Sequence, residues 1–583
     1  MSTTSGVCIL KPEFVQLDVH RELNLDHVSD KDKRKLESEG IADNLEPHVK
    51  KQKLSKKEKK ALRGQNKSRG PTFRRDFSKE LCICLINIEP DEEIPKCTRN
   101  KCSFLHDVDE YLKSKPKDLG ENCYNFDISG KCSRGLACRF GGSHISPDGK
   151  NIVDQEKFKQ YAVNAPYTTN QLQFEVQTAL RKRTYNFDLS ESLIKYNDCI
   201  RKKEEVSKDV KLVGSVTDED IIKLKAKEKK KIDFTNKLFL SPLTTVGNLP
   251  FRRICKEYGA DITCGEMAMC TTLLQGASHE WALVKRHKSE DIFGVQLCAN
   301  NPHFLTKCGE MLQKEADIDF IDLNVGCPIE LVYTNGGGCG MMRRTRVFES
   351  CIKNLTDILS IPLTVKMRMG VYSNDNIAHK LAPMVRDCGA SLLTIHGRSR
   401  EQRYTKSSNW DYIRTVAVAA SPLPVIGNGD ILSFEDYQKA REVAPEISGV
   451  MIGRGALIKP WIFTEIKEGK LLDISSSERF DILKKYTNYG LEHWGSDNIG
   501  IENTRRFLLE WLSFLYRYIP VGILEKPPQK INERPPSYKG RDELETLMAS
   551  PAASDWIKIS EMLLGPVPEN FHFLPKHKAN SYN

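Results

Sequence analysis

The chain has 583 residues, a formal net charge of +10 and a hydrophobic fraction of 39%. This length exceeds what one hydrophobic core supports, so we expect about two to four domains. No apolar run reaches the roughly 18 residues of a membrane-spanning helix, and the first residues do not have the pattern of a secretory leader. We therefore expect a soluble, monomeric protein of the cytoplasm, the nucleus or both, without a membrane partner.

The N-terminal region is rich in basic residues. Between Lys50 and Arg69 there are ten lysines and arginines and one acidic residue, Glu58, and a second basic run, KLKAKEKKK, occupies 223–231. Such segments bury too little apolar surface to fold alone, so we expect 1–75 to be disordered. A basic run can be merely solvated or can attract RNA phosphates, and we favour RNA because of the cysteines that follow.

Seven cysteines lie between residues 82 and 138 and form two similar groups. In a reducing compartment we expect thiols or metal ligands rather than disulfides. Three sulfurs and one imidazole within a short segment suit a tetrahedral structural zinc ion, and both groups resemble the tandem CCCH zinc-finger family. We therefore expect two fingers and two zinc ions in 76–150. The expected ligands are Cys82 (or Cys84), Cys97, Cys102 and His106 in the first finger, and Cys123, Cys132, Cys138 and His144 in the second.

Aromatic residues flank these ligands. They are Phe104, Tyr124, Phe126 and Phe140. Such side chains stack on unpaired RNA bases in many single-strand binders, and they equally well pack the interior of a small finger. Residues 151–232 have charged, helix-like spacing and predict a helical connector with little core of its own.

From Lys237 onward, short apolar runs alternate with amphipathic helical patterns. The runs are LFLSPL (238–243), DITCGEM (261–267), IFGVQL (292–297), DFIDLNV (319–325), PLTVKMR (362–368), SLLTIHG (391–397), PVIGNG (424–429) and GVMIGRG (449–455). Eight strands alternating with helices predict an α/β fold, a (β/α)8 TIM barrel at 233–465, with a doubly wound open sheet as the alternative. Polar residues end nearly every run, which favours the barrel because those ends would surround one mouth.

The last two runs end in GNGD and GRG, at 427–430 and 453–455. Barrels commonly bind a phosphate after their seventh and eighth strands, where backbone N–H groups are exposed. The two motifs together predict a cofactor that carries a phosphate.

The ordered motifs resemble the tRNA-dihydrouridine synthases over 236–465. They are PLT at 242–244, VQL at 295–297, NVGCP at 324–328, VKMRMG at 365–370, HGR at 396–398, NGD at 428–430 and GR at 453–454. Two CCCH fingers narrow the resemblance to the eukaryotic type-three branch, whose members reduce uridine 47 in the tRNA variable loop. Residues 466–583 are similar to the helical, RNA-binding C-terminal domain of that branch.

The resemblance implies an oxidoreductase that uses FMN, with NADPH as reductant, and that binds tRNA; messenger RNA stays open as a second substrate. Asn324 and Arg368 match positions that address the substrate base. The residues that match cofactor-binding positions are Pro242, Leu243, Thr244, Gln296, Lys366, His396, Asn428, Gly429, Asp430, Gly453 and Arg454.

Cys327 is the predicted catalytic proton donor. Reduction of a uracil ring needs an acid that is protonated at neutral pH yet able to release its proton, and a thiol meets this requirement. The neighbours Gly326 and Pro328 would aim the side chain into the mouth. A small packing residue is the alternative role for Cys327.

Two further expectations concern RNA. We expect the glycines of 336–340 to form a flexible lip, in which Thr334 and Asn335 replace a basic residue that many members carry. We expect the C-terminal cations to grip the tRNA body; they are Arg505, Arg506, Lys526, Lys530 and Arg534. Two other functions remain open: a flavin barrel that reduces a free pyrimidine, and an RNA-binding zinc-finger protein with an inert barrel.

Overall fold

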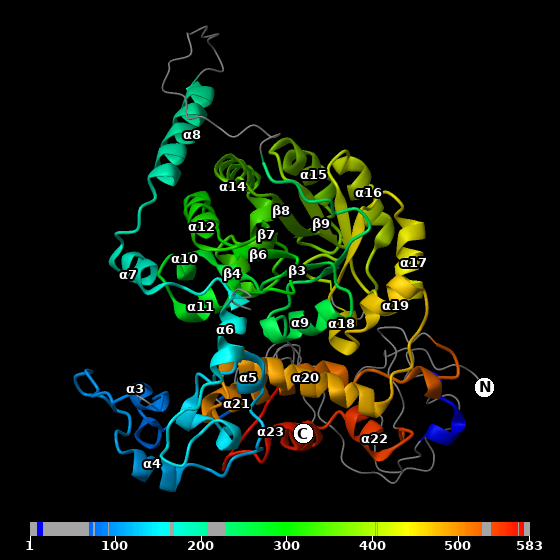
Figure 1. Cartoon of the computed structure of the whole chain (residues 1–583). Coiled ribbons are helices and arrows are strands. Elements are labelled where there is room, and N and C mark those ends of the chain that lie inside the picture. Colours follow the sequence, from blue (N-terminus) through cyan, green and yellow to red (C-terminus); the bar gives the residue numbers. More distant parts are fainter. Residues whose placement is uncertain are drawn as a thin grey trace, which may run out of the picture.

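The computed structural model describes residues 8–15, 69–70, 72–73, 76–90, 92–163, 168–206, 229–402, 404, 406–527, 538–569 and 571–576. The basic run 50–69 except Arg69, most of 223–231, Lys530 and Arg534 lie outside these residues. Figure 1 shows a barrel above a layer of long helices, with the cysteine-rich segment beside that layer. None of the described helices combines the length and the apolar character needed to span a bilayer.

Eight parallel strands form a closed barrel, which confirms the predicted fold and rules out the open sheet. Their order is β3-β2-β11-β10-β9-β8-β7-β6, and a β3–β6 pairing closes the ring. Each predicted run contains one strand. The strands are β2 (Leu238–Leu240), β3 (Ile262–Cys264), β6 (Ile292–Cys298), β7 (Phe320–Val325), β8 (Leu363–Arg368), β9 (Leu392–His396), β10 (Val425–Asn428) and β11 (Gly449–Ile452), with the short β4 (Ala268–Met269) added beside β6.

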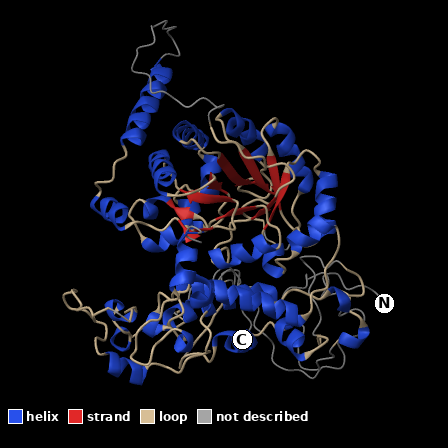
Figure 2. Cartoon of the chain, in the orientation of Figure 1, coloured by secondary structure: helices blue, strands red, loops and turns tan. Residues whose placement is uncertain are grey.

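Helices surround the strands, as the colouring by secondary structure in Figure 2 shows. Several begin at the caps that the sequence offers: the Asn301, Asn409 and Ser433 side chains each accept a backbone N–H of the following helix. The helices of the barrel region are α9 (Leu249–Glu257), α10 (Cys270–Leu273), α11 (Ser278–Trp281), α12 (Pro302–Glu315), α13 (Glu330–Thr334), α14 (Thr345–Ile358), α15 (Ala378–Asp387), α16 (Trp410–Ala420), α17 (Phe434–Val443), α18 (Arg454–Ile458) and α19 (Ile462–Glu468).

The barrel interior has an apolar layer and a polar one. Phe239, Phe320, Ile426 and Met451 belong to one buried cluster that fills the end where the strands begin. Toward the carboxyl ends, the inward positions of β6, β7 and β8 carry polar side chains instead, because residues two apart on a strand face the same side. The chemistry is therefore confined to the mouth.

The C-terminal domain flanks this mouth. It consists of α20 (Ser476–Trp494), α21 (Asn498–Leu515), α22 (Glu543–Ala549) and α23 (Ala553–Leu564). Tyr486 on α20 lies 3.3 Å from Asn248 Nδ2 at the start of α9, and Trp511 on α21 donates to the Leu457 carbonyl of α18 at 2.9 Å. Figure 1 shows α20 running directly beneath α9 and α18.

The cysteine-rich segment contains α3 (Ile83–Ile86), α4 (Val108–Ser114) and α5 (Tyr124–Ser129). The connector forms α6 (Gln155–Val163), α7 (Phe174–Lys182) and α8 (Asp188–Val206), and α8 packs on the outside of the barrel against α12 and α14. Residues 8–15, although part of the predicted disordered region, lie against the C-terminal domain, where Lys11 N donates to the Ile523 carbonyl at 3.0 Å.

Candidate active site and metal sites

A cluster of cations lies at the carboxyl ends of the strands. Lys366 and Arg368 come from β8, and Arg454 follows β11. Asp430 pairs with Arg454 at 2.7 Å and with Arg398 at 2.5 Å. One carboxylate thus faces several positive charges, which leaves the mouth with an excess of positive charge.

The electrostatics of this cluster suit an anionic ligand. Burial and the charges of Arg368 and Lys366 hold the pKa of His396 well below its usual value, so its ring is neutral at physiological pH. Burial and Arg368 also lower the pKa of Lys366, while Asp322 opposes this effect. Among the described residues the buried Ser408 hydroxyl has no hydrogen-bond partner, and it adjoins Gly429. These residues fit a phosphate-bearing cofactor.

The predicted cofactor residues gather at this end of the barrel. Pro242, Leu243 and Thr244 follow β2, Asn428 ends β10, and Gly453 follows β11. The Lys366 ammonium lies 3.5 Å from Asn428 Oδ1. Gly429 has a φ of +146°, and a Cβ there would meet Ser408 Cβ at 2.6 Å, so the close approach of this turn requires glycine.

Cys327 lies at the mouth, 8% exposed. Its N–H donates to Asn324 Oδ1 at 2.8 Å, and its carbonyl accepts the N–H of Cys339 at 3.1 Å. Gly338 has a φ of +50°, and a Cβ there would lie 2.8 Å from Cys327 Cβ. The expectation of a flexible lip was wrong for this part of the loop: residues 337–340 are buried, and they support the cysteine instead of opening around it.

Burial raises the pKa of the Cys327 thiol above its usual value. The Ile329 backbone N–H and the charges of Arg368 and Lys366 act in the opposite direction. The thiol is therefore protonated at neutral pH, and the same groups stabilise the thiolate that remains when the proton leaves.

The two predicted substrate residues also hold the loop around Cys327. Asn324 accepts the N–H groups of residues 326 and 327, and Arg368 Nε donates to the Gly326 carbonyl at 3.0 Å. Sequence reasoning missed Asp322 and Thr364, which lie beneath them in the barrel. The alternation of β7 could have revealed Asp322, since it precedes Asn324 by two positions and so faces the same side.

Aromatic residues and arginines form the rim of the mouth. Arg400 lies over the Tyr333 ring at 3.8 Å, and Arg343 donates to the Tyr372 hydroxyl at 3.1 Å. Arg344 lines a polar cavity of about 440 Å³ together with residues 334–336. Arg344 thus places a positive charge beside Thr334 and Asn335.

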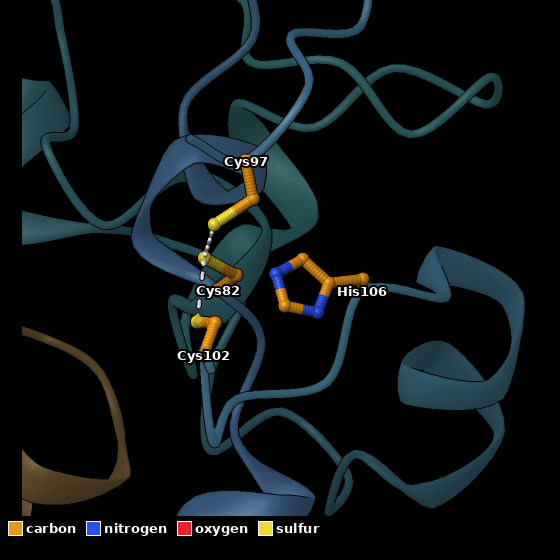
Figure 3. Close-up of side chains that lie close together, drawn as sticks. All are labelled: Cys82, Cys97, Cys102 and His106. Atoms are coloured by element: carbon orange, nitrogen blue, oxygen red, sulfur yellow. Dashed lines mark hydrogen bonds between the residues drawn. The ribbon is translucent and has the colours of Figure 1, made fainter. Parts of the chain in front are cut away.

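Both Cys₃His groups have the geometry of a tetrahedral metal site. Their ligand atoms lie within 4.8 Å of one another. Cys82 Sγ lies 3.7 Å from the sulfurs of Cys97 and Cys102. Figure 3 shows these three side chains and His106 close together. A tetrahedron with zinc–sulfur bonds of about 2.3 Å has edges of about 3.8 Å, so the spacing fits zinc. Cys84 lies 3.4 Å from Cys82 Sγ but outside the ligand set, which assigns Cys82 as the first ligand.

The second group has the supporting hydrogen bond typical of a metal-binding imidazole. His144 Nδ1 lies 3.0 Å from Asn151 Oδ1, and its Nε2 has no hydrogen-bond partner among the described residues. An amide oxygen that fixes the ring in this way leaves the other nitrogen directed at a metal. All four ligands of this group are buried.

Several residues expected to contact RNA also pack against other parts of the protein, and one of them is fully buried. Tyr124 packs near Tyr489 with ring centroids 6.4 Å apart, and Phe126 packs near His144 at 5.5 Å. Arg505 is 0% exposed and bonds to Glu502, so the prediction that it grips tRNA was wrong. Arg506 and Lys526 are exposed.

The comparisons with known proteins agree with this architecture. The family model described as dihydrouridine synthase matches residues 239–513, from β2 to α21. The chain therefore belongs to the dihydrouridine synthase family.

The similar proteins have names more specific than that of the family. A tRNA-dihydrouridine(47) synthase [NAD(P)(+)]-like protein of Xenopus tropicalis is 56% identical over 91% of this chain and 84% of its own length. The protein of that name from Homo sapiens is 52% identical over 90% and 84%. Among solved structures, morphinone reductase is 12% identical with a TM-score of 0.31 over 41% of this chain and 89% of its own, and it carries no weight in the assignment.

Proposed function

We propose that this chain reduces the C5=C6 bond of a uridine in tRNA, with FMN as cofactor and NADPH as reductant. The uridine we propose is position 47 of the variable loop. The observation that carries the proposal is the barrel mouth, where the buried thiol of Cys327 lies among the charges of Lys366 and Arg368. The names of the relatives support tRNA as the substrate.

The mouth would hold FMN through groups from several strands. Lys366 would lie by the ring, and Arg454 with the turns after β10 and β11 would bind the phosphate. When bound, FMN supplies the hydride that adds to C6 of the uracil. The chain's own contribution is to hold the base, to exclude water and to give one proton.

That proton comes from Cys327. Its Sγ–H would transfer the proton to C5 of the uracil, and the thiolate would take a new proton from water after the product leaves. Arg368 and Lys366 stabilise the thiolate in the interval. A uridine in folded tRNA is stacked, so it must be turned out into the mouth, at a cost of about a few kcal/mol.

Contacts outside the barrel would offset that cost. The rim arginines Arg343 and Arg400 would meet phosphates, for which Arg400 would leave its ion pair with Glu330. Tyr333 and Tyr372, which these arginines contact, would offer aromatic surfaces. The fingers would then hold the tRNA body, each with one structural zinc ion.

The decisive experiment compares substrates. We expect the purified protein to carry flavin and to form dihydrouridine in tRNA taken from cells that lack the protein, with mass spectrometry locating it at position 47. Equal reduction of free uridine would favour a small-molecule reductase. Absence of flavin and of NADPH oxidation with tRNA present would favour an inert barrel.

The role of Cys327 is tested by Cys327→Ala, with Cys339→Ala as the matched control. We expect Cys327→Ala to retain flavin and NADPH oxidation while uridine reduction falls by about 100-fold or more, the size expected for a lost general acid. The control should stay within about threefold of the wild type, because Cys339 contributes a backbone N–H that alanine also has. Loss of flavin in Cys327→Ala would make the cysteine structural.

The pH dependence follows from the same thiol. Because burial raises the Cys327 pKa, the thiol stays protonated above the usual value of about 8.5. Uridine reduction by prereduced enzyme should therefore persist to alkaline pH and fall only as the pH passes the raised pKa. A fall centred below about 8.5 would contradict this assignment.

A further inference from the structure

A row of hydrogen-bonded side chains crosses the barrel interior beneath Cys327. Gln296, Asp322 and Thr364 are paired across neighbouring strands in register, and Asn324 lies one step nearer the mouth. Asn324 Nδ2 donates to Gln296 Oε1 at 2.8 Å, Gln296 Nε2 donates to Asp322 Oδ2 at 2.7 Å, and the Thr364 hydroxyl donates to Asp322 Oδ1 at 2.6 Å. The row therefore connects Asp322 to the loop that carries Cys327.

The direction of every bond in this row is fixed by its two ends. Asn324 must present its oxygen to the loop, because that atom accepts two backbone N–H groups, so its nitrogen must face Gln296. Gln296 then receives at its oxygen and donates from its nitrogen. Asp322 ends the row as the group that accepts on both oxygens, which is the role of an ionised carboxylate.

Asp322 is well placed to hold that charge. It is 3% exposed, and this burial raises the pKa of its carboxyl group, while the hydrogen bonds from Gln296 and Thr364 and the positive charge of Lys366 on the neighbouring strand oppose that shift and favour the ionised form. A neutral side chain that donated toward Gln296 would reverse that amide, and a reversed Gln296 would present its nitrogen to the nitrogen of Asn324. The orientation of the catalytic loop thus depends on an acceptor at position 322.

We propose that Asp322 is a positioning residue for Cys327: through Gln296 it orients Asn324, whose oxygen holds the backbone of residues 326 and 327. The inference rests on the proposed role of Cys327 as proton donor. Asn324 keeps one amide hydrogen outside this row, which allows it to contact the substrate base as well. Asp322 acts through two other side chains and does not itself reach the reacting atoms.

The test reverses the direction of the hydrogen bonds in this row. In Asn324→Asp a carboxylate replaces the amide, so Gln296 must place its oxygen against one of two carboxylates. In Asp322→Asn/Asn324→Asp the order is restored in the opposite direction: Asn at 322 donates to Gln296, and Gln296 donates to Asp at 324. The single variant Asp322→Asn can keep the original direction if Thr364 accepts a hydrogen bond, so it should have the mildest effect.

We expect Asn324→Asp to lower single-turnover uridine reduction by prereduced enzyme about 100-fold, the loss that a misplacement of about 1 Å produces. The double variant should recover to within about tenfold of the wild type. Flavin content and the rate of flavin reduction by NADPH are measured for each variant, and starting from prereduced enzyme separates uridine reduction from any effect of a reversed Gln296 on that step. Because the double variant places a negative charge beside Cys327, its alkaline fall in activity should move to higher pH.

Hydrogen exchange of the peptide containing 325–330 provides a readout independent of activity. We expect faster exchange in Asn324→Asp than in the wild type and a return toward the wild-type rate in the double variant. If the double variant recovers neither exchange protection nor uridine reduction, Asp322 does not position the loop. If exchange follows the expected pattern but Cys327→Ala still reduces uridine, Asp322 orients the loop as proposed, and the assignment of Cys327 as proton donor is wrong.

Discussion

The two Cys₃His groups have the same ligands but very different surroundings. In the second, all four ligands are buried, whereas in the first His106 is exposed and Cys97 and Cys102 are half-buried. The second is also bonded to the long helices of the C-terminal domain: Arg139 N donates to the Ser496 carbonyl at 2.9 Å, and Cys132 Sγ lies 3.5 Å from Ser496 Oγ.

The first finger is joined mainly to the second. Lys131 pairs with Glu89 at 2.5 Å, and Asn151 N donates to the Ile88 carbonyl at 2.8 Å. It keeps apolar side chains in solvent: Ile94 is 65% exposed, and Ile83, 57% exposed, borders a cavity that it shares with Trp494 and Ile499 of the C-terminal domain. The second finger is thus part of the scaffold, while the first has surface left for a partner.

The largest effect should come from the second finger. Cys132→Ser should remove one of two zinc ions and, since structural zinc contributes on the order of 10 kcal/mol to finger folding, lower the thermal midpoint of the whole protein by about 10 °C or more. Differential scanning calorimetry with zinc analysis measures both. An unchanged midpoint would show that the second finger is not part of the scaffold.

The matching change in the first finger should separate binding from folding. We expect Cys97→Ser to lose one zinc ion, to shift the midpoint by less than about 3 °C and to raise the apparent KM for tRNA about tenfold, or about 1.4 kcal/mol. Flavin content and NADPH oxidation without tRNA are the controls. A midpoint loss as large as that of Cys132→Ser would abolish the distinction between the fingers.

A smaller effect should follow when only the attachment of the second finger is weakened. Arg139 donates to Asn498 Oδ1 at 2.6 Å and to the Lys117 carbonyl at 2.8 Å. Arg139→Ala should lower the free energy of unfolding by about 1–3 kcal/mol, measured in urea. The exposed Arg99 of the first finger supplies the control, and Arg99→Ala should stay within about 0.5 kcal/mol of the wild type.

The smallest effect concerns the exposed surface itself. Ile83→Asp should leave stability within about 0.5 kcal/mol of the wild type and weaken tRNA binding about threefold, because it places a negative charge near the RNA backbone. Val163→Asp, at an exposed position of α6, is the matched control and should not change binding. Equal effects of the two variants would place the RNA away from the first finger.

The barrel could be predicted from the sequence because its signals are local. Each strand shows as an apolar run with a polar end, and residues at the ends of different strands, such as Lys366 and His396, meet at one mouth in any such barrel. The spacing of cysteines and histidines likewise predicted the two groups of four ligands, apart from the choice between Cys82 and Cys84.

The features that could not be predicted from the sequence depend on packing between distant segments. Arg505 looked like a surface cation, but the fold places it between α21 and α23, where it donates to Ser560 Oγ at 3.1 Å. The glycines of 336–340 suggested mobility, while the close contact between Gly338 and Cys327 appears only in the folded loop. The alternation of β7 places Asp322 on the same face as Asn324, but its hydrogen bonds to Gln296 on β6 and Thr364 on β8 appear only in the folded barrel.

Helix α20 contacts both the barrel and the second finger, and so it fixes the distance between them. Tyr486 contacts the mouth, and Asn125 of the finger donates to the Leu491 carbonyl further along the same helix. A helix is stiff and rises about 1.5 Å per residue, so the span between the two attachments is constant. Under the proposed function, an RNA held by the second finger would therefore lie at a constant distance from Cys327.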